Sequence, residues 1–209
     1  NGFYSIEVEA GDYTVREVFE PGWMQTYPES GEWEVTVVAD EVLLDIDFGN
    51  TTVNDLGDAP APYPTLIADN GASHGIIPGF GLGELIDGEQ DGLPLDEAVG
   101  DDLDNLNDED GVTFPWALFA GFEETVDVTV QSAGYSPGVL NAWIDFNKDG
   151  DWDDANEQIA TDVVLDDGTH TLPFDVPLDA VVGNTVARFR YGYTRGIGPT
   201  GADWAGEVE

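Results

Sequence analysis

The chain has 209 residues with a strongly unbalanced charge, because 44 Asp and Glu residues stand against 5 Lys and Arg residues and give a formal net charge of -39. Nucleic acids and anionic membranes require a basic binding face, so this composition excludes them as partners. With 41% hydrophobic residues, 11% aromatic residues and six Trp, the chain still has ample material for a packed core. The absence of Cys excludes disulfides and thiolate metal sites, so we expect oxygen atoms to bind any metal ion.

The distribution of cations adds a second constraint. No Lys or Arg occurs between Glu17 and Asn147, so salt bridges within that segment cannot neutralise its carboxylates. Such self-repulsion destabilises a compact state unless the surroundings are saline or divalent cations bind the carboxylates. There is no apolar run of about 18 residues and no amino-terminal signal pattern, so we expect no membrane span in this segment and an export signal that was removed or lies outside it.

The first fifty residues show the two-residue period of half-buried strands. Apolar and polar residues alternate in four stretches, and Gly11-Asp12 and Pro21-Gly22 supply turn signals between them. The first two stretches fit a hairpin. The four predicted strands contain Tyr4, Ile6 and Val8; Tyr13 and Val15; Trp33, Val35 and Val37; and Leu44, Ile46 and Phe48.

Residues 54–111 are rich in Gly and Pro and show no clear alternation, so they are predicted to be loop. The part from Glu84 to Asp110 holds twelve carboxylates and no cation. A structureless loop of this length is uncommon in a compact domain unless it is functional or disordered. We therefore predict an acidic loop region at 84–111 that bound ions can order.

Strand patterns resume at Val112 and continue to Tyr193. In the last clear strand, Val186 to Tyr193, the aromatic residues share one face, and Arg188 and Arg190 share the other. No sustained helical stripe occurs. The chain is therefore predicted to be all-β, with a β-sandwich of jelly-roll or immunoglobulin-like type at residues 51–209 and long acidic calcium-binding loops.

The sharpest motif is the acidic stretch from Asp145 to Glu157. Oxygen-bearing side chains at its positions 1, 3 and 5, followed by Gly at position 6, match the start of a calcium-binding loop, in which alternate residues converge on one ion and Gly permits the sharp turn. The predicted Ca²⁺ ligands are Asp145, Asn147, Asp149, Asp151 through its carbonyl oxygen, Asp153 directly or through a water, and Glu157.

This loop departs from the helix–loop–helix form of calcium site. Position 12 is Asn156, and the glutamate expected there comes one residue later, at Glu157. The loop also follows a predicted strand, Leu140 to Phe146, instead of a helix. The competing interpretation is an acidic hairpin turn, since Asp, Asn and Gly are ordinary turn residues. Five oxygen-bearing side chains at this spacing exceed the needs of a turn, so we favour calcium.

A second acidic cluster lies in the 84–111 region. Alternating carboxylates that end in Gly occur there twice, which suits one or two further sites for a hard cation. A solvated acidic linker accounts for the same pattern equally well. The candidate ligands are Asp87, Glu89, Asp91, Asp101, Asp102, Asp108 and Asp110.

Catalytic groups are scarce. His74 and His170 are the only imidazoles, and neither lies in a metalloprotease pattern. Two carboxylates can act as the acid and base of a glycosidase, yet 44 candidates make such a pair unavoidable by chance. We therefore expect that the chain is not an enzyme, and that His74 is a surface or hydrogen-bonding residue of a Gly-rich loop.

Four tryptophans fall in loop-like contexts. Sugar-binding modules stack carbohydrate rings on exposed side chains of this kind, whereas a lone Trp more often anchors the base of a loop in the core. We favour the core interpretation for this set, which comprises Trp23, Trp116, Trp152 and Trp204.

The motifs of the chain carry two resemblances. Gly2 to Asn50 resembles the second half of the B-type repeats of bacterial surface adhesins, which are immunoglobulin-like. Residues 55–209 resemble the GEVED domain of secreted and surface proteins. The first rests on Ala10-Gly11-Asp12-Tyr13, Pro21-Gly22-Trp23 and Asp47-Phe48-Gly49-Asn50, and the second on Asp55-Leu56-Gly57-Asp58, Gly71-Ala72-Ser73-His74-Gly75, Trp143-Ile144-Asp145 and the closing Gly206-Glu207-Val208-Glu209.

These resemblances imply a partial immunoglobulin-like β unit at residues 1–50 and an extracellular protein, secreted or at the cell surface, with several domains. We expect a calcium-stabilised structural or adhesive module whose partners are neighbouring domains or copies of the same protein. Strand exchange between copies would extend the module into an extracellular fibre. The alternative is a carbohydrate-binding accessory module of a secreted hydrolase, with a surface glycan as its partner.

Overall fold

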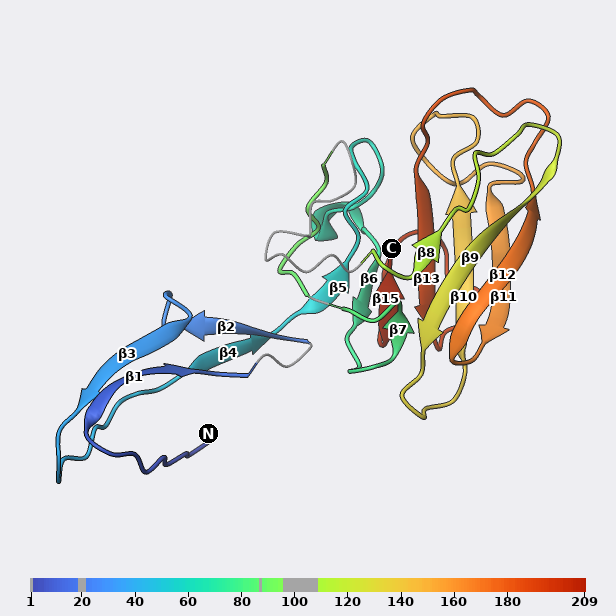
Figure 1. Ribbon diagram of the computed structural model, residues 1–209. Helices are drawn as coiled ribbons and strands as arrows, with labels where there is room; N and C mark the ends of the chain where they lie inside the picture. Colours follow the sequence, from blue (N-terminus) through green and yellow to red (C-terminus); the bar gives the residue numbers. More distant parts are fainter. Residues whose placement is uncertain (1, 19–21, 87, 96–108) are drawn as a thin grey trace.

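Strands dominate the chain, which confirms the predicted all-β class (Figure 1). The computed structural model describes residues 2–18, 22–86, 88–95 and 109–209. Within these ranges the only helix is one 3₁₀ turn, η1 (Ile67–Asp69), and no helix is long and apolar enough to cross a membrane. The strands are β1 (Gly11–Arg16), β2 (Trp23–Tyr27), β3 (Glu32–Val37), β4 (Gly49–Thr52), β5 (Asn54–Leu56), β6 (Ser73–Gly75), β7 (Gly81–Leu82), β8 (Val112–Thr113), β9 (Glu123–Gln131), β10 (Gly138–Ile144), β11 (Gln158–Leu165), β12 (Gly168–Asp175), β13 (Ala187–Gly192), β14 (Ala202–Asp203) and β15 (Gly206–Val208).

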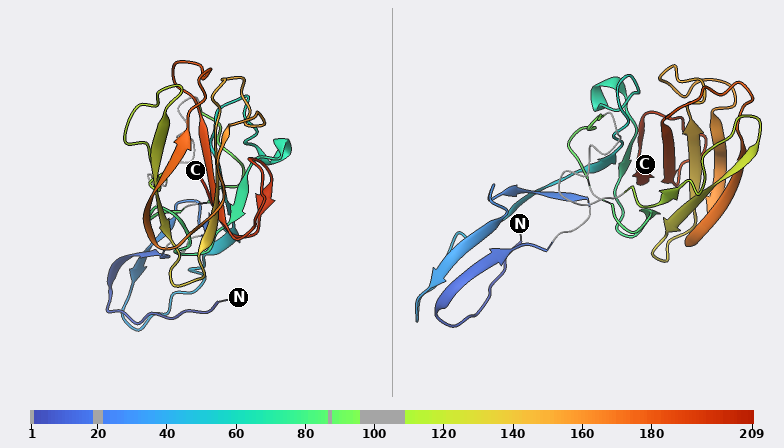
Figure 2. Two further views of the ribbon diagram at one scale, coloured as in Figure 1. Left: turned by 90° about the vertical axis from the view of Figure 1, so that its right-hand side faces the viewer. Right: turned by 45° about the horizontal axis from the view of Figure 1, so that its top comes forward.

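Two antiparallel sheets form the β-sandwich, which stands at the right of Figure 1 and is seen from its side in Figure 2. One sheet has the order β11-β10-β13-β15, and the other has the order β12-β9-β7, with β8 also paired to β9. Alternate side chains of both sheets build one buried core, as the two-residue period requires. Its largest members include Phe80, Leu82, Val126, Val128, Leu140, Ile144, Phe174, Phe189 and Tyr191.

The central strand β13 is buried on both faces. Phe189 and Tyr191 point into the sandwich core, as the alternation predicted, while Arg188 and Arg190 occupy the opposite face and are each only 1% exposed. The small sheet β14-β6-β5 packs beside β15, between the sandwich and the amino-terminal strands (Figure 1). The arginines therefore lie between the sandwich and the segments outside it.

Hydrogen bonds from these two guanidinium groups organise the outer segments. Arg190 donates to the carbonyl oxygens of Gly198, Thr200 and Gly201 at 2.8, 2.8 and 2.7 Å. Arg188 donates to the carbonyl oxygens of Pro64 and Pro199, both at 2.9 Å, and lies 4.3 Å from the centre of the Trp152 ring. Burial lowers the pKa of Arg188 to about 9, so the group remains charged at neutral pH.

His74 completes this buried layer. It is fully buried on β6, where the sequence predicted a surface or hydrogen-bonding residue, and Arg190 Nε donates to its Nε2 atom at 3.0 Å. Since a guanidinium can only donate, Nε2 is unprotonated and Nδ1 carries the hydrogen, 3.3 Å from the carbonyl oxygen of Ala205. Burial, followed by the charge of Arg190, lowers the pKa of His74 to about 3.

The amino-terminal strands form a separate, thinner unit, at the lower left of Figure 1. β1 pairs with β3, and β2 pairs with β4. In the described parts of residues 2–52 no residue is buried. Tyr4 to Val8 and Leu44 to Phe48 were predicted as strands but are not strands in the structure, so β1 pairs with β3 in place of the predicted hairpin.

The prediction of loop at residues 54–111 is wrong in part, because β5, β6 and β7 lie there. Each of these strands has two or three residues. β5 pairs with β6, and the other partners are farther away in sequence, because β6 also pairs with β14 and β7 pairs with β9. A strand this short cannot display an alternating pattern.

We predict a pH dependence of stability from His74. Its pKa in the folded chain lies below the unfolded value of 6.5, so the unfolded state takes up a proton first and stability is lost as pH falls from 6.5 toward 3. In His74→Gln, the amide oxygen can still accept from Arg190. Between pH 7 and pH 5 the free energy of unfolding of the wild type should fall relative to that of the variant by about 2 kcal/mol, measured by urea unfolding. Parallel pH profiles of the two proteins would contradict this.

Candidate metal centre

The predicted calcium loop connects β10 to β11 and is organised around a buried carboxylate. Asp145 is fully buried, and its two oxygens accept from Lys148 N at 2.5 Å, Gly150 N at 3.0 Å and the Tyr63 hydroxyl at 2.6 Å. Both Lys148 and Gly150 have positive φ, at 62° and 94°, which is the tight curvature that Gly was expected to permit. Asp145 therefore shapes the loop through main-chain amide groups.

Glu157 plays the same part at the far end of the loop. It is 2% exposed, and its oxygens accept from Phe146 N at 3.1 Å and Asp154 N at 3.3 Å. Burial raises its pKa, since a charged carboxylate loses hydration there. Asp145 and Glu157, the first and last predicted ligands, thus form the inner frame of the loop.

The other acidic residues of the loop gather on its outside. The three-aspartate cluster consists of Asp149, Asp151 and Asp154, which are exposed or half-buried and offer carboxylate oxygens within 4.8 Å of one another. Asn147 stands beside it, because its amide donates to Asp149 at 3.1 Å and to Asp154 at 2.5 Å. Asp153, which was predicted in place of Asp154, donates its main-chain N–H to Asp151 at 2.9 Å and is not in the cluster.

This donor set fits a hard cation. Calcium binds oxygen ligands at about 2.3–2.6 Å, so two oxygens on the same ion lie at most roughly 5 Å apart. The spread of 4.8 Å satisfies that limit. Three carboxylates at this separation repel one another in the absence of a cation. Lys148, the sole basic residue of the loop, donates to the carbonyl oxygen of Val182 at 3.1 Å, and one positive charge cannot balance the three carboxylates.

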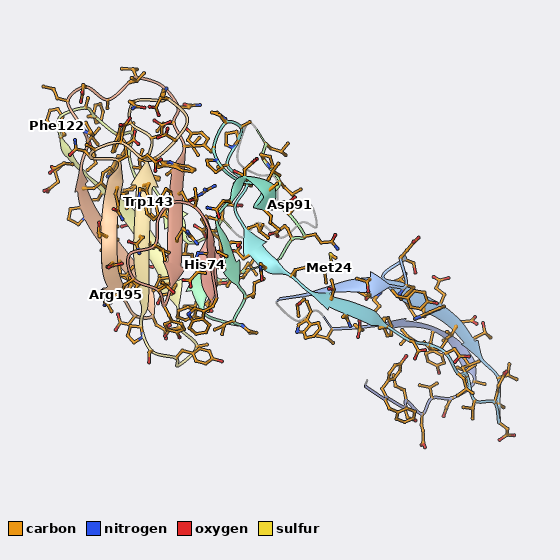
Figure 3. All side chains as sticks on the ribbon, turned by 180° about the vertical axis from the view of Figure 1, so that it is seen from behind. Met24, His74, Asp91, Phe122, Trp143 and Arg195 are labelled. Atoms are coloured by element: carbon orange, nitrogen blue, oxygen red, sulfur yellow. The ribbon has the colours of Figure 1, made fainter. Side chains whose placement is uncertain are left out.

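The described residues of the second predicted acidic cluster do not converge on one point. Asp87, Asp101, Asp102 and Asp108 lie outside the described residues. The three remaining carboxylates bind main-chain amides of separate segments: Glu89 accepts from Leu56 N at 3.0 Å, Asp91 from Ile67 N at 2.8 Å and Asp110 from Glu84 N at 2.8 Å. Asp91 lies on the segment beside the sandwich, next to η1 (Figure 3).

Several motif residues act as framework, which the sequence did not reveal. Asp55 accepts from Val208 N at 2.6 Å and Glu209 from Gly111 N at 2.9 Å, while Glu207 accepts from Leu82 N. Gly206 is required as Gly, because its φ is 133° and an added Cβ would lie 1.9 Å from the Tyr191 carbonyl oxygen. The closing motif therefore ties β15 to β7, β13 and the chain before β8.

The four tryptophans differ in burial. Trp152 is buried against Trp143 and Ala59, as favoured above. The core interpretation is wrong for the others, since Trp23, Trp116 and Trp204 are 50%, 75% and 65% exposed. Sequence context alone did not distinguish them, because all four lie next to turn residues.

The comparisons with known proteins identify one region. Residues 139–209, from β10 to β15, match the family model of the GEVED domain. No curated protein and no solved structure matches the chain. The resemblance of Gly2 to Asn50 to an adhesin repeat stays a prediction, and the carboxyl-terminal third of the chain is similar to a GEVED domain, an extracellular type of module.

Proposed function

We propose that the chain is a calcium-stabilised structural and adhesive module of a secreted or cell-surface protein, and not an enzyme. The observation that carries the proposal is the convergence of Asp149, Asp151 and Asp154 on one point at the end of the sandwich. The GEVED-like region supports the extracellular setting.

The loop places its two kinds of carboxylate in different roles. Asp145 and Glu157 hold the main chain from inside, so the outer aspartates are presented on a fixed turn. A divalent cation bound there would neutralise two negative charges and join Asp149 and Asp151 to Asp154, at opposite sides of the turn. Because calcium is scarce in the cytosol, the loop would become rigid only after export.

Calcium should therefore raise the melting temperature of the chain. At a calcium concentration about a hundredfold above Kd, binding stabilises the folded state by about 2.7 kcal/mol, which corresponds to a rise of about 5–10 °C for a chain of this size. The measurement is thermal unfolding with calcium and with excess chelator, at fixed high sodium chloride so that general screening stays constant.

A matched pair of variants separates specific binding from charge. Asp149→Asn with Asp151→Asn should abolish the calcium-dependent rise. Asp175→Asn with Asp179→Asn removes the same charge from exposed positions outside the loop. This control pair should retain the calcium-dependent rise in melting temperature. A rise that survives the first pair, or no rise in the unaltered chain, would overturn the calcium proposal.

The amino-terminal unit supports a role for neighbouring copies. Its two-stranded sheets leave strand edges open in the described residues, and apolar side chains of this unit are exposed, among them Phe3 at 94% and Ile6 at 64%. Open edges with apolar neighbours favour pairing with further strands. We propose that a neighbouring copy of the chain supplies the strands that pair with these open edges. Repeated pairing of this kind would join copies head to tail.

Assembly of this kind predicts a concentration-dependent mass. In sedimentation velocity with calcium present, the wild-type chain should associate over about two decades of concentration, because mass action drives pairing. Ile6→Asp with Val8→Asp, at exposed positions, should reduce the association. A chain that remains monomeric throughout would rule out this mode of assembly.

A further inference from the structure

A stack of three aromatic rings lies at the end of the sandwich opposite the calcium loop. Phe80 stacks on Tyr193 with a centroid distance of 4.3 Å, and Tyr193 stacks on Trp204 at 5.4 Å. The interplanar angles are 18° and 20°, so the three rings are nearly parallel. Phe80 is fully buried and Trp204 is 65% exposed. The stack therefore runs from the core to the surface and presents the Trp204 indole to solvent.

The register of the sheet fixes the location of the stack. Gly192, just before Tyr193, pairs with Val139 at the start of β10, whereas the calcium loop follows the end of β10. Figure 3 shows Arg195, which follows Tyr193 by two residues, and Phe122 at opposite ends of the sandwich. Trp204 is thus remote from the three-aspartate cluster.

Hydrogen bonds hold the loops that carry Tyr193 and Trp204. Asp203 Oδ1 accepts from the Thr194 hydroxyl at 2.6 Å and from Trp204 N at 2.7 Å, so one carboxylate joins the two loops. Asp162 of β11 accepts from Gly196 N at 2.8 Å. The exposed ring is therefore held in place before any ligand arrives, which reduces the entropy lost on binding.

A second exposed ring comes from the loop between β9 and β10. Tyr135 is 52% exposed and meets Phe80 edge-on, at 6.4 Å and 88°. Its hydroxyl lies close enough to Tyr193 to contribute, after burial, to the raised pKa of that residue. Tyr135 and Tyr193 thus bring two phenol hydroxyls to the same end of the sandwich as Trp204, and each can both donate and accept hydrogen bonds.

The surroundings narrow the class of ligand. Nucleobases also stack on aromatic rings, but their phosphates are repelled by a chain of net charge -39. Trp204 and Tyr135 are two partly exposed rings, at 65% and 52%, and offer far less apolar surface than the about 800 Å² per partner of a stable protein interface. A neutral pyranose ring matches the flat apolar face of Trp204, and its hydroxyl groups can bond to the exposed phenol of Tyr135.

We propose that Trp204, Tyr193 and Tyr135 form a binding site for the pyranose rings of a neutral polysaccharide. One sugar ring stacks on the outer face of Trp204, whose inner face rests on Tyr193, and the exposed phenol of Tyr135 bonds to hydroxyl groups of a neighbouring ring of the same polysaccharide. This site gives the adhesive role a chemical target, and it does not depend on the calcium loop at the other end of the sandwich.

The test is affinity electrophoresis of the whole chain in gels that contain soluble neutral polysaccharides: a β-glucan, a xylan, a galactomannan and a mannan. At least one should retard the wild type. Trp204→Ala should weaken that binding about tenfold or more, as truncation of a central aromatic anchor does, while Trp204→Phe should retain most of it. The matched control is Trp116→Ala, at a Trp that is 75% exposed on the loop preceding β9.

Each outcome decides the proposal. Retardation that is lost in Trp204→Ala and kept in Trp116→Ala supports it, provided that both variants melt like the wild type. Retardation by none of the four polysaccharides overturns it. Equal loss in both variants, or no loss in Trp204→Ala, also overturns it. Chelation of calcium serves as a further control, because sugar binding should persist at temperatures where the chelated chain remains folded.

Discussion

The shortage of cations is the constraint on which the rest of the structure depends. Two of the five basic residues, Arg188 and Arg190, are buried, and both donate to main-chain carbonyl oxygens of the outer segments. They fix those segments and cannot screen the surface. The acidic side chains must therefore find other partners, and many of them accept from main-chain N–H groups, as Asp91 and Asp145 do. Where three carboxylates lie close together, as Asp149, Asp151 and Asp154 do, hydrogen bonds from Asn147 and from Asp153 N do not neutralise their charge, and a cation from outside would complement them.

Several residues of the family motifs lie around the two buried arginines. Burial disfavours the charged form of both arginines; Asp58 lies close enough to favour it in Arg188, and Asp203 and then Asp55 do the same in Arg190. An isolated buried charge is very costly, so these aspartates are part of what permits a charged layer outside β13. His74 belongs to the same layer as a neutral acceptor. The motifs that suggested a family are thus mainly the frame of the fold, and the surfaces that face solvent lie elsewhere.

The sequence allowed the sandwich to be predicted well where strands are long, because a period of two over eight or nine residues is hard to mistake, as in β9. It could not show that the arginine face of β13 is buried, since that depends on segments more than a hundred residues away, such as Pro64. In the loop from Asp145 to Glu157, the alternating pattern singled out Asp149 and the carbonyl oxygen of Asp151, and the structure brings the carboxylates of both residues near that of Asp154. The pattern included Asp153 and not Asp154 because spacing alone does not reveal which side of a turn a side chain occupies.

The two ends of the sandwich differ in what holds their loops. At one end the turn after β10 carries three neighbouring aspartates, whose mutual repulsion a bound cation would relieve. At the other end Trp204 rests on Tyr193 and Phe80, so its position depends on packing that reaches the core. Every residue of β10 between them is buried. A cation bound at the proposed site would therefore stiffen that end without rearranging the aromatic surface, because none of the three aspartates contributes to that surface.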